Sequence, residues 1–511
     1  MKIAFVCAED EIPGVCYLSS HLKNHGHQVF LVFEPKQFSR AYLRNDRLAK
    51  IFSRERENLT QLSQINPDLI GFSCTTAHYQ WALDFSKKVK QVLPSTPIIF
   101  GGTHSTLVPE LVMKEKSIDF VCVGEGEDPL LELVTALMKH KTSFPIKNIW
   151  YKRGGKVVKN PLRPLRASLD DLPHIDKGIY RGHLPDSYFT HSYFFTSRGC
   201  PYNCSYCGVE QLRKIVEGLG TFVRRMSPRR AVEELVILKK KYGTRYILFE
   251  DDIFALDLKW LKEFIPLYKK RVNLPFTCFG HTRLFNDEVA RLLTKGGCDL
   301  VWFGVQSANE TIRKNVFQRL ESNDQIRQAA SLCHKYRLKF MVDHILNVPM
   351  DNYEAIKEAI SLYNTIRPAV INCYNLLYFP KAKINDFALK SGLIKKKDIN
   401  LINQGRHTIY QTGDLHAKKE DYYTKYALLI SSVPLMPAFV VEMISKSDKL
   451  ISIFSQLPLF LIPLVKIVLN FKAGRGFLPL AVLRMEIFFT TQFIKQKLVR
   501  LIFNTQYGQK T

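Results

Sequence analysis

The chain has 511 residues, which is enough for roughly two to four domains that each bury a core of their own. A hydrophobic content of 46% excludes an intrinsically disordered protein. The formal net charge of +26 predicts attraction to polyanions, either nucleic acid or an anionic membrane surface.

Residues 1–145 alternate buried-strand patterns with helical patterns. The strand-like runs are Ile3–Cys7, Gln28–Phe33, Asp68–Ser73, Pro97–Gly101 and Asp119–Gly124. Continuous apolar strands that alternate with helices are typical of an α/β fold with a doubly wound, flavodoxin-like parallel sheet. The N-terminal apolar run is too short for a signal peptide, so we expect a cytoplasmic protein with reduced thiols.

Three turns of this N-terminal region follow predicted strands and are candidates for ligand contact. They contain Ser73 and Thr75, then Gly101, Gly102 and His104, and then Gly124, Glu125 and Gly126. Glycine after a strand often serves only to turn the chain. Ligands of doubly wound sheets bind at the carboxyl ends of the strands, and three such turns together predict a ligand-binding floor.

The middle of the chain predicts a linker followed by a second parallel sheet. Residues 146–190 are rich in proline and contain one hairpin, centred on Gly154 and Gly155. Residues 191–390 predict six strand–helix units, with strands at 193–197, 246–250, 275–279, 299–304, 339–346 and 370–377. Such a sheet curls into a partial (β/α)6 barrel, and barrel enzymes keep their chemistry at the carboxyl ends of the strands.

A cysteine-rich loop follows the first of these strands. Cys200, Cys204 and Cys207 have the spacing Cys-x3-Cys-x2-Cys. Three thiolates on one loop can hold three irons of a [4Fe–4S] cluster and leave the fourth iron open to a ligand. Structural zinc takes four ligands, and no second cysteine or histidine pair lies nearby. The motif therefore favours the cluster, with zinc or reduced structural thiols as alternatives.

At residues 1–390 the chain resembles the cobalamin-binding radical SAM enzymes, the group that includes an anaerobic magnesium-protoporphyrin cyclase and hopanoid methylases. The cysteine triplet matches the radical SAM signature, including the aromatic Tyr206 before the last cysteine. The N-terminal region matches in the ordered patterns Pro67–Ser73, Phe100–Ser105 and Val123–Glu127. The resemblance implies three cofactors, a [4Fe–4S] cluster on the cysteines, S-adenosyl-L-methionine and cobalamin. It also implies a 5′-deoxyadenosyl radical that abstracts hydrogen from an unactivated carbon.

The resemblance also suggests which residues contact adenosylmethionine. Asp251 and Asp252 follow the second barrel strand, where a carboxylate suits the methionyl ammonium group, although a helix cap or an ion pair would also explain them. Arg283 follows the third strand and could bind a carboxylate or form a surface salt bridge. Gln306 and Ser307 follow the fourth strand, in a variant of the family's Gly-x-Glu-Ser-Gly turn, and can hydrogen-bond a ribose or an amino group.

The cobalt-ligating motif Asp-x-His-x-x-Gly does not occur in residues 1–145. His104 belongs instead to the family's glycine-glycine turn, and a lone histidine in a turn is more often structural than a metal ligand. We therefore expect cobalamin without histidine on the cobalt, with its lower face on the three turns. Loss of cobalamin binding is the alternative.

Residues 391–511 predict a mainly helical, apolar and basic region. Its apolar runs are Tyr426–Val441, Leu450–Phe471 and Phe477–Phe503, and prolines or charged residues interrupt all three. Such runs argue against a membrane-spanning helix. They fit amphipathic helices at a membrane interface and equally fit a helical domain packed on the barrel.

The leading functional hypothesis is a cobalamin-dependent radical SAM enzyme that methylates or rearranges an unactivated carbon of an apolar, lipid-like or tetrapyrrole-like substrate. The expected partners are that small-molecule or lipid substrate, an electron donor such as flavodoxin or ferredoxin, and an anionic membrane surface. One rival is a transfer-RNA-modifying enzyme of the methylthiotransferase type, although Cys7, Cys16 and Cys74 lack the spacing of an additional cluster and nucleic acid is not expected. The other rival is a non-catalytic protein that binds cobalamin or a metal.

Overall fold

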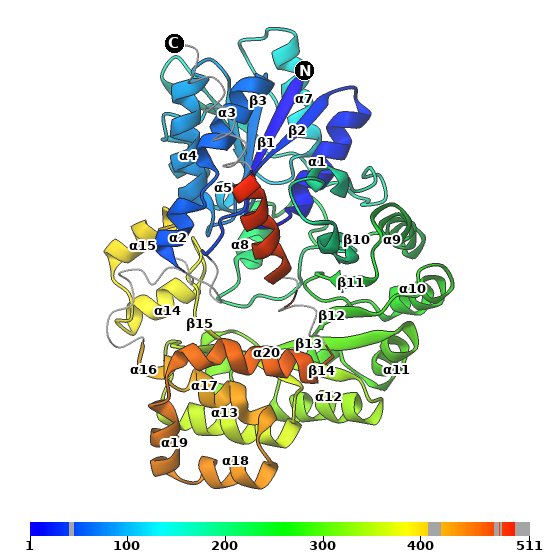
Figure 1. Ribbon diagram of the computed structural model, residues 1–511, viewed down its shortest axis with the longest axis vertical. Coiled ribbons are helices and arrows are strands. Elements are labelled where there is room, and N and C mark those ends of the chain that lie inside the picture. Colours follow the sequence, from blue (N-terminus) through cyan, green and yellow to red (C-terminus); the bar gives the residue numbers. More distant parts are fainter. Residues whose placement is uncertain (40–44, 407–420, 475–479, 481–482, 496–511) are drawn as a thin grey trace.

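The computed structural model describes residues 1–39, 45–406, 421–474, 480 and 483–495. Figure 1 shows one sheet formed by the N-terminal part of the chain and a second sheet formed by the middle part, with helices of the C-terminal part beside the second sheet. The predicted fold, a doubly wound domain followed by a partial barrel and a helical region, is confirmed.

The N-terminal sheet has the strand order β2-β1-β3-β4-β5-β6-β7. The parallel strands are β1 (Lys2–Ala8), β2 (Gln28–Glu34), β3 (Leu69–Ser73), β4 (Ile98–Gly101) and β5 (Phe120–Cys122). The order 2-1-3-4-5 is that of flavodoxin-like sheets. The predicted hairpin, β6 (Ile149–Arg153) and β7 (Lys156–Lys159), is present and adds two antiparallel strands to this sheet.

Helices cover both faces of this sheet. They are α1 (Pro13–Asn24), α2 (Asp46–Ile51), α3 (Glu55–Ile65), α4 (Tyr79–Val92), α5 (Thr103–Leu107), α6 (Pro109–Met113) and α7 (Glu127–Met138). Apolar residues of α1 and α7 pack with alternate β1 residues such as Phe5, whereas those of α3 and α4 pack with the residues between, such as Val6. Successive strand residues point to opposite faces, so continuous apolar strands are buried on both sides.

The second sheet has six parallel strands in the order β15-β14-β13-β12-β11-β8. They are β8 (His191–Phe194), β11 (Tyr246–Phe249), β12 (Phe276–Gly280), β13 (Cys298–Gln306), β14 (Lys339–Leu346) and β15 (Val370–Asn375). The helices between them are α9 (Pro228–Tyr242), α10 (Leu258–Arg271), α11 (Asp287–Gly296), α12 (Asn323–Lys335) and α13 (Tyr353–Ile366). Helix α14 (Ile384–Lys390) follows β15, so all six strand–helix units expected from the sequence are present.

The two faces of this second sheet have different neighbours. Phe303, Val342 and Ile371 belong to the large core that includes the covering helices. The alternate residues, such as Trp302 and Met341, belong to the opposite face and pack with the C-terminal helix α20 (Ile462–Lys472). We call that opposite face the inner face of the barrel.

The C-terminal region is helical and packs on both domains. Its helices are α15 (Lys396–Asn403), α16 (Asp421–Thr424), α17 (Ala427–Ser432), α18 (Ala438–Ser445), α19 (Asp448–Ser455), α20 and a helix at 483–495. The helix at 483–495 returns to the N-terminal domain, where Phe489 lies 6.3 Å from Phe33 between ring centroids (Figure 1). Parts of the run Phe477–Phe503, including Lys497 and Arg500, lie outside the described residues. None of the described helices has the length and apolar character needed to cross a bilayer.

Candidate active site

The three cysteines lie on a loop between the short strand β9 (Ser197–Arg198) and helix α8 (Gly208–Ile215). β9 pairs with β10 (Arg224–Arg225), which fixes the entry to the loop. Gly199 has φ of +89°, and a Cβ at this position would lie 2.6 Å from the Phe222 carbonyl oxygen. Only glycine fits there, so the turn into the loop depends on that residue.

Neighbouring segments hold the loop at the carboxyl ends of the barrel strands. The backbone N–H of Ser205 donates to the Phe317 carbonyl at 3.0 Å, and the Ser205 carbonyl accepts from the Ile384 N–H at 2.9 Å. The rings of Tyr206 and Phe317 pack edge to face at 5.0 Å. The loop is therefore supported by segments more than 100 residues further along the chain, which preorganises the thiols.

All three cysteine side chains are partly buried. Burial raises the pKa of the Cys200 thiol to about 12 and that of Cys207 to about 11, and it also raises the pKa of Cys204. Within the described ranges, no group of three or more histidine, cysteine, aspartate or glutamate residues is arranged to hold a single metal ion. A metal bound by these cysteines would displace the thiol protons, because the thiolate is the form that ligates a metal.

The two adjacent carboxylates that follow β11 have different surroundings. Asp251 is fully buried, and it accepts hydrogen bonds from the Thr196 N–H at 3.2 Å, from the Thr196 hydroxyl at 2.8 Å and from the Ser197 hydroxyl. Asp252 reaches solvent close to the thiols, and desolvation together with the Asp251 charge raises its pKa to about 6. Asp251 therefore fastens the strand that leads into the cysteine loop, and Asp252 is free to contact a ligand.

A pocket of about 620 Å³ opens beside Cys204 and is lined by Arg283, His281, Arg319 and Tyr202, among others. Arg283 is exposed, and the rings of Tyr202 and His281 stack at 4.3 Å. Burial and the neighbouring arginines lower the pKa of His281 to about 4, so this imidazole is neutral at physiological pH. The pocket therefore offers fixed positive charge from its arginines next to the cysteine loop.

Arg319 is the residue of this pocket that sequence reasoning missed. Its guanidinium donates to the Tyr206 hydroxyl at 3.2 Å and lies 3.9 Å from the Cys204 sulfur. It also pairs with the buried carboxylate of Glu321. Arg319 lies more than 100 residues after the cysteines, so only the tertiary fold brings it close to them. The one sequence feature that could have indicated it is its position soon after the fourth barrel strand.

Gln306 and Ser307 lie at the end of β13 and are both buried. Gln306 has φ of +67°, and its side chain lies over Gly304 together with that of Arg319. A Cβ at Gly304 would meet the Gln306 amide nitrogen at 2.5 Å, so the glycine makes room for this arrangement. Gln306 is thereby brought towards the cysteine loop, whereas the Ser307 hydroxyl accepts a hydrogen bond from the Asn309 N–H at 3.2 Å.

In the N-terminal domain, the first two predicted turns lie side by side. Ser73 and Gly101 are register partners at the ends of β3 and β4, and Thr75 is exposed. His104 is fully buried, stacks on Tyr79 at 4.1 Å, and has its pKa lowered by burial to about 3. It therefore lies inside the domain as a neutral side chain, with its Nδ1 3.2 Å from the hydroxyl oxygen of Thr76 in the first turn.

The third turn, Gly124 to Gly126, contacts the barrel. The Glu125 carboxylate pairs with Arg198 at 2.9 Å and with Arg224 at 2.7 Å, both from the short β9–β10 sheet. Desolvation is the largest single effect on Glu125, but the two arginines outweigh it and lower its pKa to about 2. Glu125 thus joins the N-terminal domain to the strands that lead into the cysteine loop.

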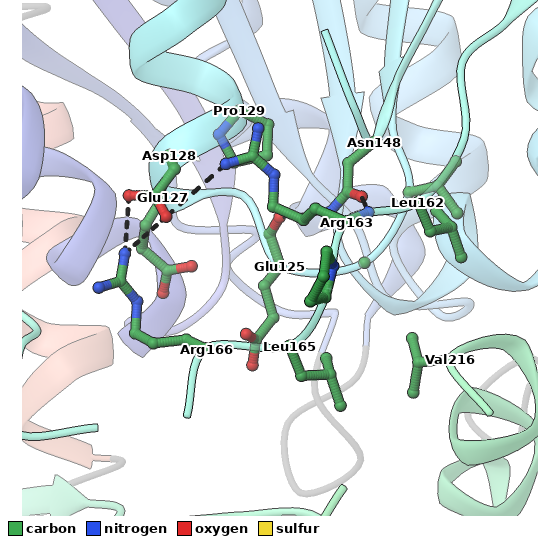
Figure 2. Close-up of a pocket in the computed structure, with 13 residues that line it drawn as sticks. Glu125, Glu127, Asp128, Pro129, Asn148, Leu162, Arg163, Leu165, Arg166 and Val216 are labelled. Atoms are coloured by element: carbon green, nitrogen blue, oxygen red, sulfur yellow. Dashed lines mark hydrogen bonds and ion pairs between the residues drawn. The ribbon is translucent and has the colours of Figure 1, made fainter. Parts of the chain in front are cut away.

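Glu125 also borders a pocket of about 200 Å³ between this turn and residues 162–166. Figure 2 shows the Arg166 guanidinium bonded to Asp128 on one side, at 2.7 Å, and the Arg163 backbone bonded to Asn148 on the other. The pocket walls are thus held by ion pairs and hydrogen bonds.

Comparison with protein families identifies two domains. The model for a B12 binding domain matches residues 11–134, and the model for the radical SAM superfamily matches residues 194–363. The first covers the sheet with the three turns, and the second begins in β8, just before the cysteine loop. Both domain types predicted from the sequence are confirmed.

Individual relatives agree with this assignment. An uncharacterized methyltransferase of Pyrococcus horikoshii is 29% identical over 340 residues, which are 65% of this chain and 72% of the relative. An anaerobic magnesium-protoporphyrin IX monomethyl ester cyclase of Synechocystis is 24% identical over 259 residues, 48% of this chain and 49% of the relative. The radical S-adenosylmethionine methyltransferase TsrM of Kitasatospora setae, solved with cobalamin and a [4Fe–4S] cluster, has the same fold. Its TM-score is 0.60 at 16% identity, over 75% of this chain and 73% of that chain.

Proposed function

We propose that this chain, in which a radical SAM model matches residues 194–363 and a B12 binding model matches residues 11–134, is a cobalamin-dependent enzyme that methylates an unactivated carbon of an apolar substrate. The observation that carries the proposal is the position of the cysteine loop. It lies at the carboxyl ends of the barrel strands, and the strand leading into it is paired through Arg198 with Glu125 of the B12-binding domain. This places the two cofactor domains against each other at one end of the barrel.

The residues around the loop fit a [4Fe–4S] cluster and adenosylmethionine. Cys200, Cys204 and Cys207 would hold the cluster, and Asp252 would accept from the methionyl ammonium group. Arg319 and Arg283 supply positive charge that suits the methionyl carboxylate. Gln306 and Ser307 offer an amide and a hydroxyl that suit the ribose.

The turns at the ends of β3 and β4 fit cobalamin without a histidine ligand. Ser73 and Gly101 are small and partly exposed, so a large cofactor could approach the backbone at these strand ends. His104 is buried among the strands and helices of its own domain. Strand ends that present no imidazole suit a cofactor whose lower face has no protein ligand.

When bound, these cofactors supply one-electron chemistry that activates a C–H bond and a methyl group for transfer. The chain's own contribution is position and exclusion of water. Asp251 and Gly199 fix the loop, and the Glu125 ion pairs fix the distance between the two domains. Arg319 remains charged in its partly buried position because Glu321 compensates it.

The substrate, partners and location are further parts of this proposal. An apolar substrate fits the apolar C-terminal helices, and one relative is by name a magnesium-protoporphyrin IX monomethyl ester cyclase. The net charge of +26 suits a negatively charged electron carrier such as flavodoxin or ferredoxin. Exposed apolar residues on α18–α20, above all Phe439 and Phe460, support peripheral contact of a cytoplasmic protein with an anionic membrane.

The test is anaerobic reconstitution with iron, sulfide and hydroxocobalamin, followed by reduction in the presence of adenosylmethionine. We expect a cluster absorption band, bound corrin and 5′-deoxyadenosine. The Cys204→Ser variant should lose the cluster and the deoxyadenosine but keep the corrin, because its site is in the other domain. Deoxyadenosine without bound corrin would retain the radical enzyme and overturn cobalamin-dependent methylation. Loss of both in the unchanged protein would overturn the whole proposal.

A further inference from the structure

Helix α20 packs directly on the inner face of the barrel. Leu469 and Ala473 are buried with Leu300 of β13, Met341 of β14 and Val370 of β15. The Lys339 ammonium group donates to the Ala473 carbonyl at 2.8 Å, which fixes the end of the helix. A segment of the C-terminal region is therefore part of the barrel interior.

One residue of α20 brings a charge to this interior. The Lys466 ammonium group lies over the Tyr374 ring, 5.3 Å from its centroid, and near Asp343. The side chain is partly buried, and desolvation lowers its pKa. Across the part of the chain that the structure describes, this ammonium group has no hydrogen bond and no ion pair within 4 Å. The Tyr374 ring and the more distant Asp343 carboxylate compensate this partly buried cation only in part, and a directly bonded anionic ligand would compensate it further.

The residues around Lys466 would suit an apolar body next to that anion. The rings of Phe279 and Trp302 stack at 4.8 Å on the inner face. Asp343 is the acidic neighbour, and its carboxylate accepts from the Asn372 amide at 3.2 Å. The inner face thus provides three aromatic rings, the Asp343 carboxyl group bonded to Asn372, and the Lys466 ammonium group over the Tyr374 ring.

This cluster is close to the proposed reaction centre. Asp343 is the register partner of Gly304, two residues before Gln306 on β13. At the rise of a parallel strand, two residues correspond to roughly 7 Å. A ligand held at Lys466 would therefore extend towards the carboxyl ends of the strands, where barrel enzymes carry out their chemistry.

We propose that Lys466 binds an acidic group of the substrate, while Phe279, Trp302 and Tyr374 hold its apolar body. The substrate class is then an apolar molecule that carries a carboxylate or a phosphate. This inference rests on the proposed function, and it assigns the C-terminal region a role in substrate selection. The nearby Asp343 carboxylate opposes a bound anion, so it weakens this selection and does not cause it.

The test uses the reconstituted full chain and three probes of similar aromatic body, 1-naphthaleneacetate, 1-naphthyl phosphate and the neutral 1-naphthaleneethanol. The dissociation constant measured by calorimetry should be lower for at least one of the two acids than for the alcohol. The Lys466→Gln variant should bind that acid with an affinity lower by about tenfold or more, and its affinity for the alcohol should change by less than about twofold. Lys466→Arg should retain the preference, and Lys449→Gln, an exposed lysine on α19, should change nothing.

A second variant tests the same idea in the opposite direction. Asp343→Asn removes the neighbouring negative charge and should tighten binding of the acid about threefold. Equal affinity of the unchanged protein for acids and alcohol, absence of binding by all three probes, or an unchanged acid affinity in Lys466→Gln would overturn the inference. Formation of 5′-deoxyadenosine is measured in parallel. If 5′-deoxyadenosine still forms but Lys466→Gln binds the acid normally, only the proposed substrate site is wrong. If Lys466→Gln weakens acid binding but no 5′-deoxyadenosine forms, the proposed function is wrong instead.

Discussion

At the scale of single residues, identical side chains in adjacent positions have different roles. Asp251 is fully buried and takes three hydrogen bonds from Thr196 and Ser197, whereas its neighbour Asp252 reaches solvent beside the thiols. The hydrogen bonds from Thr196 and Ser197 hold Asp251 inside the protein, whereas Asp252 begins the turn that follows. Of these two adjacent carboxylates, Asp251 therefore has a structural role, and Asp252 is the candidate for binding a ligand.

The turn into the cysteine loop depends on a single residue, Gly199. Gly199→Ala should destabilise the cysteine loop by about 1–3 kcal/mol, because its φ of +89° is unfavourable for alanine and its Cβ would meet the Phe222 carbonyl. The measurement is iron bound per chain after anaerobic reconstitution, together with the melting temperature. Gly208→Ala is the matched control, since a Cβ there would lie 4.0 Å from the nearest atom, in the Phe379 ring. Equal iron content in both variants would contradict the prediction.

At the scale of elements, one turn of the B12-binding domain meets one small sheet of the barrel. The Glu125 carboxylate, which belongs to the turn between β5 and α7, lies between Arg198 of β9 and Arg224 of β10. Arg198 also pairs with Glu127 at the start of α7. Two arginines and two carboxylates therefore connect the strand that opens the cysteine loop to the other cofactor domain.

This connection should make stability depend on pH in the acid range. Because the pKa of folded Glu125 is lowered to about 2, its stabilising contribution is fully present above the ordinary glutamate pKa and is lost as the pH falls towards 2. We expect a contribution on the order of 2 kcal/mol at neutral pH, allowing for the solvent that still reaches the group. Glu125→Gln should lower the melting temperature at pH 7, and its difference from the unchanged protein should shrink between pH 5 and 3.

A surface carboxylate provides the control for this experiment. Glu110 pairs with Lys159 at 3.2 Å, but both side chains are about half exposed and both belong to the N-terminal domain. Glu110→Gln should therefore change the melting temperature little at any pH. Similar pH profiles for the two variants would show that the interdomain ion pairs contribute no special stability.

At the scale of the whole molecule, the C-terminal region packs on both cofactor domains and still exposes apolar surface. α17 and α20 pack beside β15, while the helix at 483–495 packs on the N-terminal domain through Phe489. Phe439 and Phe460 are 67% and 72% exposed, which is unusual for large apolar side chains. The C-terminal helices therefore pack on the barrel, which was one interpretation of the sequence. Their exposed apolar residues also keep open the other interpretation, contact with a membrane interface.

Vesicle binding distinguishes the two interpretations. The full chain should co-sediment with phosphatidylglycerol vesicles more than with phosphatidylcholine vesicles, and less at high salt, because basic and apolar contacts act together. The double change Phe439→Ser and Phe460→Ser should reduce binding about tenfold. Ile51→Ser removes a comparably exposed apolar residue from α2 and should have no effect. Failure of the unchanged protein to bind either vesicle would leave packing as the role of these helices.

The sequence predicted the fold well because strands and helices have local signatures. All six barrel strands were placed within a few residues of β8 to β15, and the hairpin around Gly154 was recognised from its turn. Contacts between distant segments have no such signature. Arg319 at the cysteine loop, the ion pairs of Glu125 and the position of Lys466 over Tyr374 all join residues of different elements, and only tertiary packing shows them.

The return of the helix at 483–495 to the first domain has a consequence for biosynthesis. Phe489 lies against Phe33, and the Gln37 amide donates to the Thr490 hydroxyl at 3.1 Å, so late residues cover a surface formed by very early ones. While the ribosome is still making the intervening chain, that surface faces water or a chaperone. The first domain therefore reaches its final packing only after the helix at 483–495 has been synthesised.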